Sequence, residues 1–374
     1  MENKFRNKIL KLALPITAQQ FMLALVSACD AFMLGGLNQN SLSAVSLASQ
    51  ITFVFNLILT ALTIGENMFV AQYYGKKDFD GLRTSAGLVL KYVVAVSGFF
   101  FIATLFVPET LMRLFTNDII LIDYGVKYLK LIGLSYVFSG ILQVLQGILK
   151  NCGYVGKCTM ISTIVVCVNI ALNAVLIYVY FGFPRMEIAG AALATVIANG
   201  IGLVITIYIL HLKKELWVGI SDIKKRKINI TTKFWKHVYP VLLNELVWGG
   251  GFTMYSVILG HLGSDAVAAN SIANITKNLL ICVCTGFGYG GSIGEGNLFE
   301  ARKSGNTLCK IAVFSGILTG GMILLMTPVI LHFTNLTDIA GGYLKYMLFM
   351  SSYYVIGKSI NSMTIGGIFP AGGD

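Results

Sequence analysis

Charged residues are scarce in this sequence. Asp, Glu, Lys and Arg make up 12% of the 374 residues, whereas a soluble domain carries about 25%. This scarcity excludes a water-soluble globular domain, because too little polar surface remains to cover one of this size. Hydrophobic residues make up 56% of the chain and the mean hydropathy is +0.75, so the solvent that suits this chain is lipid.

Paired cysteines and metal-ligand spacings are also missing. The seven cysteines are irregularly spaced, and the four histidines stand singly near expected helix ends. Neither pattern is typical of a disulfide framework or a zinc site. We therefore expect no metal and no cofactor.

The sequence has no ATP-binding loop and no catalytic motif. The nearest match to a phosphate loop is Gly156-Lys157, but Asn151 stands where the first glycine is needed and Cys158 replaces the Ser or Thr. We expect neither an ATPase nor an enzyme. Transport by such a chain would draw its energy from an ion gradient.

Apolar runs long enough to cross a bilayer fill most of the chain. A crossing helix needs about 20 apolar residues, and a backbone in lipid satisfies its hydrogen bonds within a helix. The sequence therefore predicts an all-α polytopic membrane protein. Ten helices are expected at residues 9–37, 44–75, 84–107, 119–149, 157–182, 188–212, 233–262, 266–297, 307–333 and 338–368.

Lys and Arg gather on one side of these helices. With the N-terminus inside, twenty fall in inner segments, including the run 224–227 (KKRK), and two, Arg113 and Arg185, fall in outer loops. This asymmetry predicts a multi-pass protein of the plasma (inner) membrane with a cytoplasmic N-terminus. The basic loop is expected to meet anionic lipid rather than nucleic acid. A secretory signal at 4–29 is an alternative, but an equivalent segment near Pro240 argues against it.

The two halves of the chain resemble each other. Landmarks recur in the same order, and six helices separate the two copies, so both start inside. We expect a two-lobed bundle of pseudo-symmetric six-helix repeats, with lobes at 1–212 and 233–374 joined by a basic cytoplasmic linker at 213–232. The second copy has four helices, so two expected helices are missing after Asp374. The six matched pairs are Pro15 and Pro240, 37–38 and 262–263, 44–51 and 268–275, 114–117 and 332–335, 128–130 and 343–345, and 147–153 and 367–373.

Polar residues inside the expected helices mark a candidate cation-coupling site. Asp30, Asn169, Asn173 and Thr195 share a depth in the outer half of the first lobe. One carboxylate with amide and hydroxyl oxygens would coordinate Na⁺, or the carboxyl alone would carry H⁺. The alternative is that Asn169, Asn173 and Thr195 only tie helices together by hydrogen bonds.

A second candidate group lies in the other lobe. Glu245 and Lys277 are near mid-depth, where they would form an ion pair, or Glu245 would be a second proton site. Asn244 lies beside Glu245, and Trp248, one turn on, would stack against a cationic or aromatic compound. The structural alternative is that this group only joins helices.

These landmarks resemble the multidrug and toxic compound extrusion (MATE) family over essentially the whole chain. The order of the motifs carries the resemblance more than any single one does. The motifs are Leu14-Pro15, 30–32 (DAF) with Gly35, 71–78 (AQYYGKKD), 181–184 (FGFP), 190–195 (GAALAT) and 371–374 (AGGD).

The resemblance implies two six-helix lobes forming a V, and export of cationic or amphipathic compounds by H⁺ or Na⁺ antiport. We expect the protein to be a monomer. Asp30, Asn169 and Thr195 match residues of the family's cation site. Asn173 is a departure, because several members have an aspartate there, and this change favours a proton on Asp30 over Na⁺. Glu245 lies near the glutamate of another branch.

Two other functions compete with export. A flippase for lipid-linked oligosaccharides shares this superfamily's lobes, but such proteins resemble chains with more helices and a cavity rich in Arg or Lys. A membrane receptor or scaffold without transport is the other alternative, and the duplicated lobes and deep carboxylates argue against it.

Overall fold

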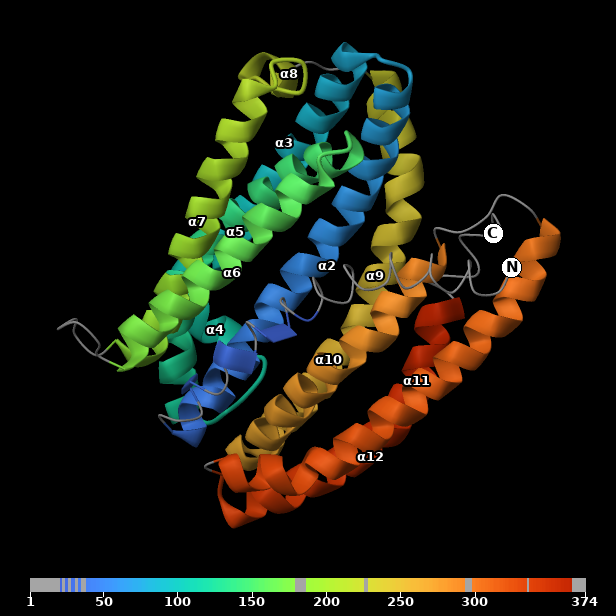
Figure 1. Cartoon of the computed structure of the whole chain (residues 1–374). Coiled ribbons are helices and arrows are strands. Elements are labelled where there is room, and N and C mark those ends of the chain that lie inside the picture. The colour runs from blue at the N-terminus through green and yellow to red at the C-terminus, as the bar shows by residue number, and fades with distance from the viewer. Residues whose placement is uncertain are drawn as a thin grey trace. The chain divides into compact units, whose positions relative to one another are not determined.

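The computed structural model describes residues 21, 24–25, 28–30, 33–34, 38–178, 186–224, 228–292, 298–334 and 336–364. Within these ranges the chain is helical apart from short connections, as Figure 1 shows. The all-α prediction is confirmed. The expected helix at 9–37 lies largely outside the described residues, although its described positions from 21 to 34 are helical.

One compact unit runs from Ser43 to Val267. Within it α5 packs against α3, α6 and α7, and α6 also packs against α7 (Figure 1). The helices of this unit are α2 (Gln39–Gly75) from its second turn, α3 (Phe79–Phe106), α4 (Pro108–Arg113), α5 (Ile119–Asn151), α6 (Val155–Tyr178), α7 (Glu187–Leu212), α8 (Ile220–Lys224) and α9 (Ile228–Leu262).

The other compact unit combines Met1–Leu42 with Ala268–Asp374. It contains most of α10 (Ser264–Ser292) and all of α11 (Leu298–Phe333) and α12 (Asp338–Met363). Small residues let α11 approach α12 closely: a Cβ added to Gly320 would lie 2.6 Å from the carbonyl oxygen of Ser352. The compact units do not follow the expected boundaries at 212 and 233, and the two lobes stay a prediction.

Short polar caps and glycines set several helix ends. Asp78 accepts a hydrogen bond from the Gly81 amide at 2.8 Å, Asp118 accepts one from Ile120 at 2.9 Å, and Thr337 accepts one from Ala340 at 3.2 Å. Such side chains satisfy amides that the first helical turn leaves unbonded. Gly263 joins α9 to α10 with φ of 110°, a conformation that glycine adopts at little cost.

Six described helical segments are long and apolar enough to cross a membrane. Helices α9, α10 and α12 are also long, with 35, 29 and 26 residues. All nine of these helices overlap expected ones. The six apolar segments are Gln39–Gly75, Phe79–Phe106, Ile119–Asn151, Val155–Ile177, Glu187–Leu212 and Cys309–Phe333.

Two polar stretches that were expected to be loops are partly helical. The predicted linker at 213–232 contains α8 and the first turn of α9. Helix α8 packs on α3 at Gly87, where an added Cβ would lie 2.8 Å from the backbone of Asp222. Helix α11 begins at Leu298, nine residues before the expected start. Polarity alone is therefore a poor guide to where these helices begin.

Helix α9 lies against α2 along much of its length. Gly249 of α9 contacts the Leu57 side chain, and Gly65 of α2 contacts Val238. Near the start of α9, the ring centres of Phe69 and Phe234 are 6.2 Å apart, and those of Trp235 and Tyr92 of α3 are 5.1 Å apart. Glycines in the contact allow this close approach.

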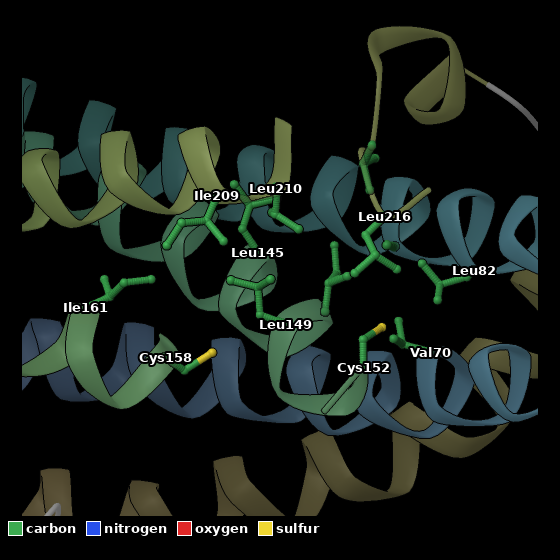
Figure 2. Packing of buried hydrophobic residues seen from close by; sticks show 13 residues of the cluster. Val70, Leu82, Leu145, Leu149, Cys152, Cys158, Ile161, Ile209, Leu210 and Leu216 are labelled. Carbon is green, nitrogen blue, oxygen red and sulfur yellow. The ribbon is translucent and has the colours of Figure 1, made fainter. Parts of the chain in front are cut away.

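A cluster of buried apolar side chains joins several helices of the Ser43–Val267 unit (Figure 2). Val70 of α2, Leu82 of α3, Leu145 and Leu149 of α5, and Leu210 of α7 are all buried in it. Cys152 joins them just after α5, and burial raises the pKa of its thiol to about 11. At neutral pH this thiol is protonated and packs as a small apolar group.

Candidate functional site

Three of the predicted coupling residues form one hydrogen-bonded chain between α6 and α7. Asn173 Nδ2 donates to Asn169 Oδ1 at 3.1 Å, and Asn169 Nδ2 donates to Thr195 Oγ1 at 3.2 Å. Thr195 Oγ1 in turn donates to the Ala191 carbonyl at 3.1 Å. We call Asn169, Asn173 and Thr195 the amide chain.

The amide chain is buried where α6 packs on α7. Asn173 is fully buried, Asn169 is 4% exposed and Thr195 is partly buried. A spacing of four residues places both asparagines on one face of α6. The sequence predicts these three side chains at one depth, and Asn169 bonds to each of the other two. Their bonds join two helices, as the structural alternative requires, and their oxygens suit a hard cation. Their role in coupling stays a prediction.

Asp30 lies in the other compact unit. It is helical and partly buried, next to Ala28, which is 2% exposed. The amide chain belongs to Ser43–Val267. The predicted site that joins Asp30 to Asn169, Asn173 and Thr195 therefore stays a prediction.

The candidate group on α9 presents aromatic and polar side chains together. Trp248 is 48% exposed, and its ring lies 4.7 Å from that of Phe252 and 6.1 Å from that of Phe53 on α2. Asn244, one turn before Trp248, is exposed, and Glu245 is partly buried. Asn244, Trp248 and Phe252 recur every four residues and therefore share a face of α9.

Lys277 belongs to α10 in the other unit. Its ammonium group donates to Asn274 Oδ1 at 2.7 Å and lies 5.1 Å from the centre of the Tyr354 ring on α12. A cation over an aromatic face is stabilised by the negative face of the ring. Because Lys277 and Glu245 belong to different units, the ion pair predicted between them stays a prediction.

Two polar residues of α2 were missed by the sequence analysis. Asn56 and Thr60 are exposed although they lie inside an apolar spanning segment. They lie three and seven residues after Phe53, on the face that carries the contact with Trp248. An asparagine within an apolar run was the signal available, because lipid disfavours an exposed amide.

We call Phe53, Asn56, Thr60, Asn244, Trp248 and Phe252 the mixed face of α2 and α9. The contact of Gly249 with Leu57 brings its two helices together. Its rings suit apolar or cationic groups, and its amides suit polar ones. Among the described residues, no group of three His, Cys, Asp or Glu side chains is placed to hold a metal ion.

Comparison with known proteins identifies the relatives of this chain. The MatE family model matches residues 15–175. The chain is 24% identical to the multidrug resistance protein NorM of Photobacterium profundum, over 96% of this chain and 81% of that protein. It is also 24% identical to a probable multidrug resistance protein NorM of Thermotoga maritima, over 74% of this chain. The match spans 59% of the Thermotoga protein's length.

Solved structures share the fold. A multidrug resistance MATE family transporter of the MOP superfamily, in its inward-facing conformation, aligns with a TM-score of 0.82 and 19% identity, covering 97% of this chain and 84% of that one. A MOP superfamily transporter from Pyrococcus furiosus aligns with a TM-score of 0.74 and 19% identity, covering 98% and 82%. The helical membrane fold and the MatE match to residues 15–175 agree with the motifs found in the sequence, and the chain is similar to MATE family proteins.

Proposed function

We propose that the chain is a multidrug efflux transporter that exports cationic or amphipathic compounds in exchange for H⁺ or Na⁺. The observation that carries the proposal is the mixed face of α2 and α9, where Trp248, Phe53 and Asn56 are presented together. An amphipathic cation needs both an aromatic surface for its charge and rings and polar atoms for its other groups.

The names of the relatives support the proposal. NorM of Photobacterium profundum is named a multidrug resistance protein, and it is similar over 96% of this chain. An aromatic face tolerates many substrates, because its contacts depend little on the exact positions of donors and acceptors. This tolerance is what a transporter of varied compounds requires.

Coupling is assigned to Asp30, supported by the amide chain. A carboxyl group that takes up and releases a cation changes charge, and the cost of that charge in an apolar environment links cation binding to conformation. Asn173 stands where several members have an aspartate, so Asp30 would be the main charge at the site. We expect H⁺ to couple better than Na⁺.

The distribution of Lys and Arg orients the transporter. Twenty basic residues in predicted inner segments against two in outer loops place the N-terminus in the cytoplasm and the chain in the plasma membrane. In this assignment the partners are lipid and a small substrate, not nucleic acid, and the protein works as a monomer without a cofactor.

Transport by the purified chain in liposomes tests this function. Ethidium efflux is followed by fluorescence while a Na⁺ gradient and a pH gradient are imposed separately. We expect efflux under the pH gradient and less under the Na⁺ gradient, and none when an ionophore collapses both.

A second assay tests the competing function. Liposomes that contain a fluorescent lipid-linked sugar report flipping from one leaflet to the other. Flipping without ethidium efflux would replace the multidrug proposal by the flippase. Efflux that persists after both gradients collapse would show that export does not depend on cation antiport.

A further inference from the structure

Glu66 is a buried carboxyl group that the proposed mechanism does not use. Its exposed fraction is 0%, and neither Oε1 nor Oε2 has a hydrogen-bond partner among the described residues. It lies nine residues before Gly75, the end of α2, or roughly 14 Å at 1.5 Å per residue.

The close approach of α5 buries this carboxyl. A Cβ added to Gly147 of α5 would lie 2.9 Å from Glu66 Oε2. Next to it, Asn151 Nδ2 donates to Asn67 Oδ1 at 2.7 Å and to the Gly147 carbonyl at 2.8 Å. The neighbouring Asn67 side chain therefore bonds to α5, and the Glu66 carboxyl does not.

Apart from the bonded Asn67 and Asn151 side chains, the neighbours of Glu66 on two sides are apolar. Val70, one turn on, packs with Leu145 and Ile148 of α5 in the apolar cluster of Figure 2. On another side, Gly65 contacts Val238 and Phe234 of α9. An ionised carboxylate without a partner is very costly to bury in such a site, whereas a neutral carboxylic acid costs much less.

In the described part of the chain, Glu66 forms no ion pair. Two ion pairs, Arg113 with Glu109 and Lys127 with Asp123, lie on the surface and do not involve Glu66. The titratable residues on this part of α2 and on the helices packed around it form no ion pair or hydrogen bond with Glu66 in the described part of the chain. They are Tyr73 of α2, Arg83 and Lys91 of α3, Lys150 of α5, and Lys233, Lys236 and His237 of α9.

We propose that Glu66 is a proton-binding site, protonated while α2 packs against α5 at Gly147 and deprotonated when the two helices separate. On separation the proton passes to water and leaves a hydrated carboxylate. The site would be a second titrating carboxyl, on a different helix from Asp30. Its part in transport rests on the proposed function, but proton binding itself does not.

Infrared difference spectroscopy of the purified full chain tests the proposal without any transport. A protonated carboxylic acid has a carbonyl stretch that a carboxylate lacks. At neutral pH we expect this band in the unaltered chain. In Glu66→Gln the intensity of the band should fall by the contribution of one carboxylic acid. Glu109→Gln is the matched control, because Glu109 is exposed and paired with Arg113 at 2.8 Å, and it should leave the band unchanged.

A band of equal intensity in Glu66→Gln and the unaltered chain would overturn the proposal. If Glu66→Gln fails to fold, the same spectrum is recorded from the unaltered chain with a heavy carbon isotope in its glutamate carboxyl groups. The band of a protonated glutamate must then shift in frequency. A band from protonated Asp30 would stay in place, because aspartate is not labelled. An unshifted band overturns the proposal. A chain that shows the Glu66 band but no ethidium efflux would retain the proton site and lose the proposed function.

Discussion

Two sets of buried polar side chains lie in the same compact unit, and their bonding is opposite. In the amide chain, Asn173 bonds to Asn169, which bonds to Thr195. Glu66 has two buried oxygens without a partner in the described part of the chain. The amide chain joins two helices and therefore stabilises the fold. A carboxyl buried without partners does not stabilise the fold, so another role must account for its position, and proton binding supplies one.

The largest effect is expected at neither set but at Asp30. Asp30→Asn removes the charge that changes when a cation binds, and gradient-driven ethidium efflux should fall to the level of protein-free vesicles. The control is Asp123→Asn, since Asp123 is exposed and paired with Lys127. Unchanged gradient-driven efflux in Asp30→Asn would move coupling away from this residue, with Glu66 the next carboxyl to test.

Breaking the amide chain should cost stability. Asn169→Leu leaves Asn173 and Thr195 without these two bonds, and we expect the free energy of unfolding in detergent to fall by about 1–2 kcal/mol. Asn56→Leu is the matched control, because Asn56 is exposed, and its effect should be much smaller. Equal effects of the two substitutions would show that the amide chain is not a stabilising link.

Removing the indole ring should weaken substrate binding moderately. Trp248→Ala takes away a cation–π contact worth about 1 kcal/mol at an exposed site. The ethidium concentration for half-maximal efflux should then rise about fivefold. Trp248→Phe keeps an aromatic ring and should recover most of the affinity. If Trp248→Ala transports ethidium with unaltered affinity, the mixed face is not the substrate surface.

The smallest effect is expected at Glu66. Gln is a neutral isostere of the protonated acid, so Glu66→Gln should change the free energy of unfolding at neutral pH by less than about 0.5 kcal/mol. Chemical unfolding in detergent measures this difference. A loss of several kcal/mol would mean that the carboxyl is bonded in a way that the amide cannot reproduce, and the contrast with the amide chain would disappear.

The helices and one part of the site were predictable from sequence. Apolar runs gave nine of the ten expected helices to within a few residues at most ends, because lipid leaves little choice but helix. The sequence predicts a shared depth for Asn169, Asn173 and Thr195, and hydrogen bonds link Asn173 to Asn169 and Asn169 to Thr195. The predicted start of α11 was wrong, since residues 298–306, which carry the charged side chains Glu300, Arg302 and Lys303, are already helical.

Residues whose importance depends on packing were not predictable. Glu66 lies near the end of an expected helix, where a glutamate usually reaches water. Only the approach of α5 at Gly147 shows that it is buried. Asn56 and Thr60 became notable only when α9 was placed beside α2. Contacts between segments far apart in the chain decide both cases, and a single sequence does not contain them.

The most direct test of antiport measures the cation rather than the drug. Coupling is reciprocal, so a substrate gradient must drive the cation in the opposite direction. Liposomes that contain the chain and a trapped pH dye receive ethidium on one side only, with no ion gradient imposed. We predict a pH change inside the vesicles that is absent in Asp30→Asn. Ethidium movement without any flux of H⁺ or Na⁺ would contradict the account.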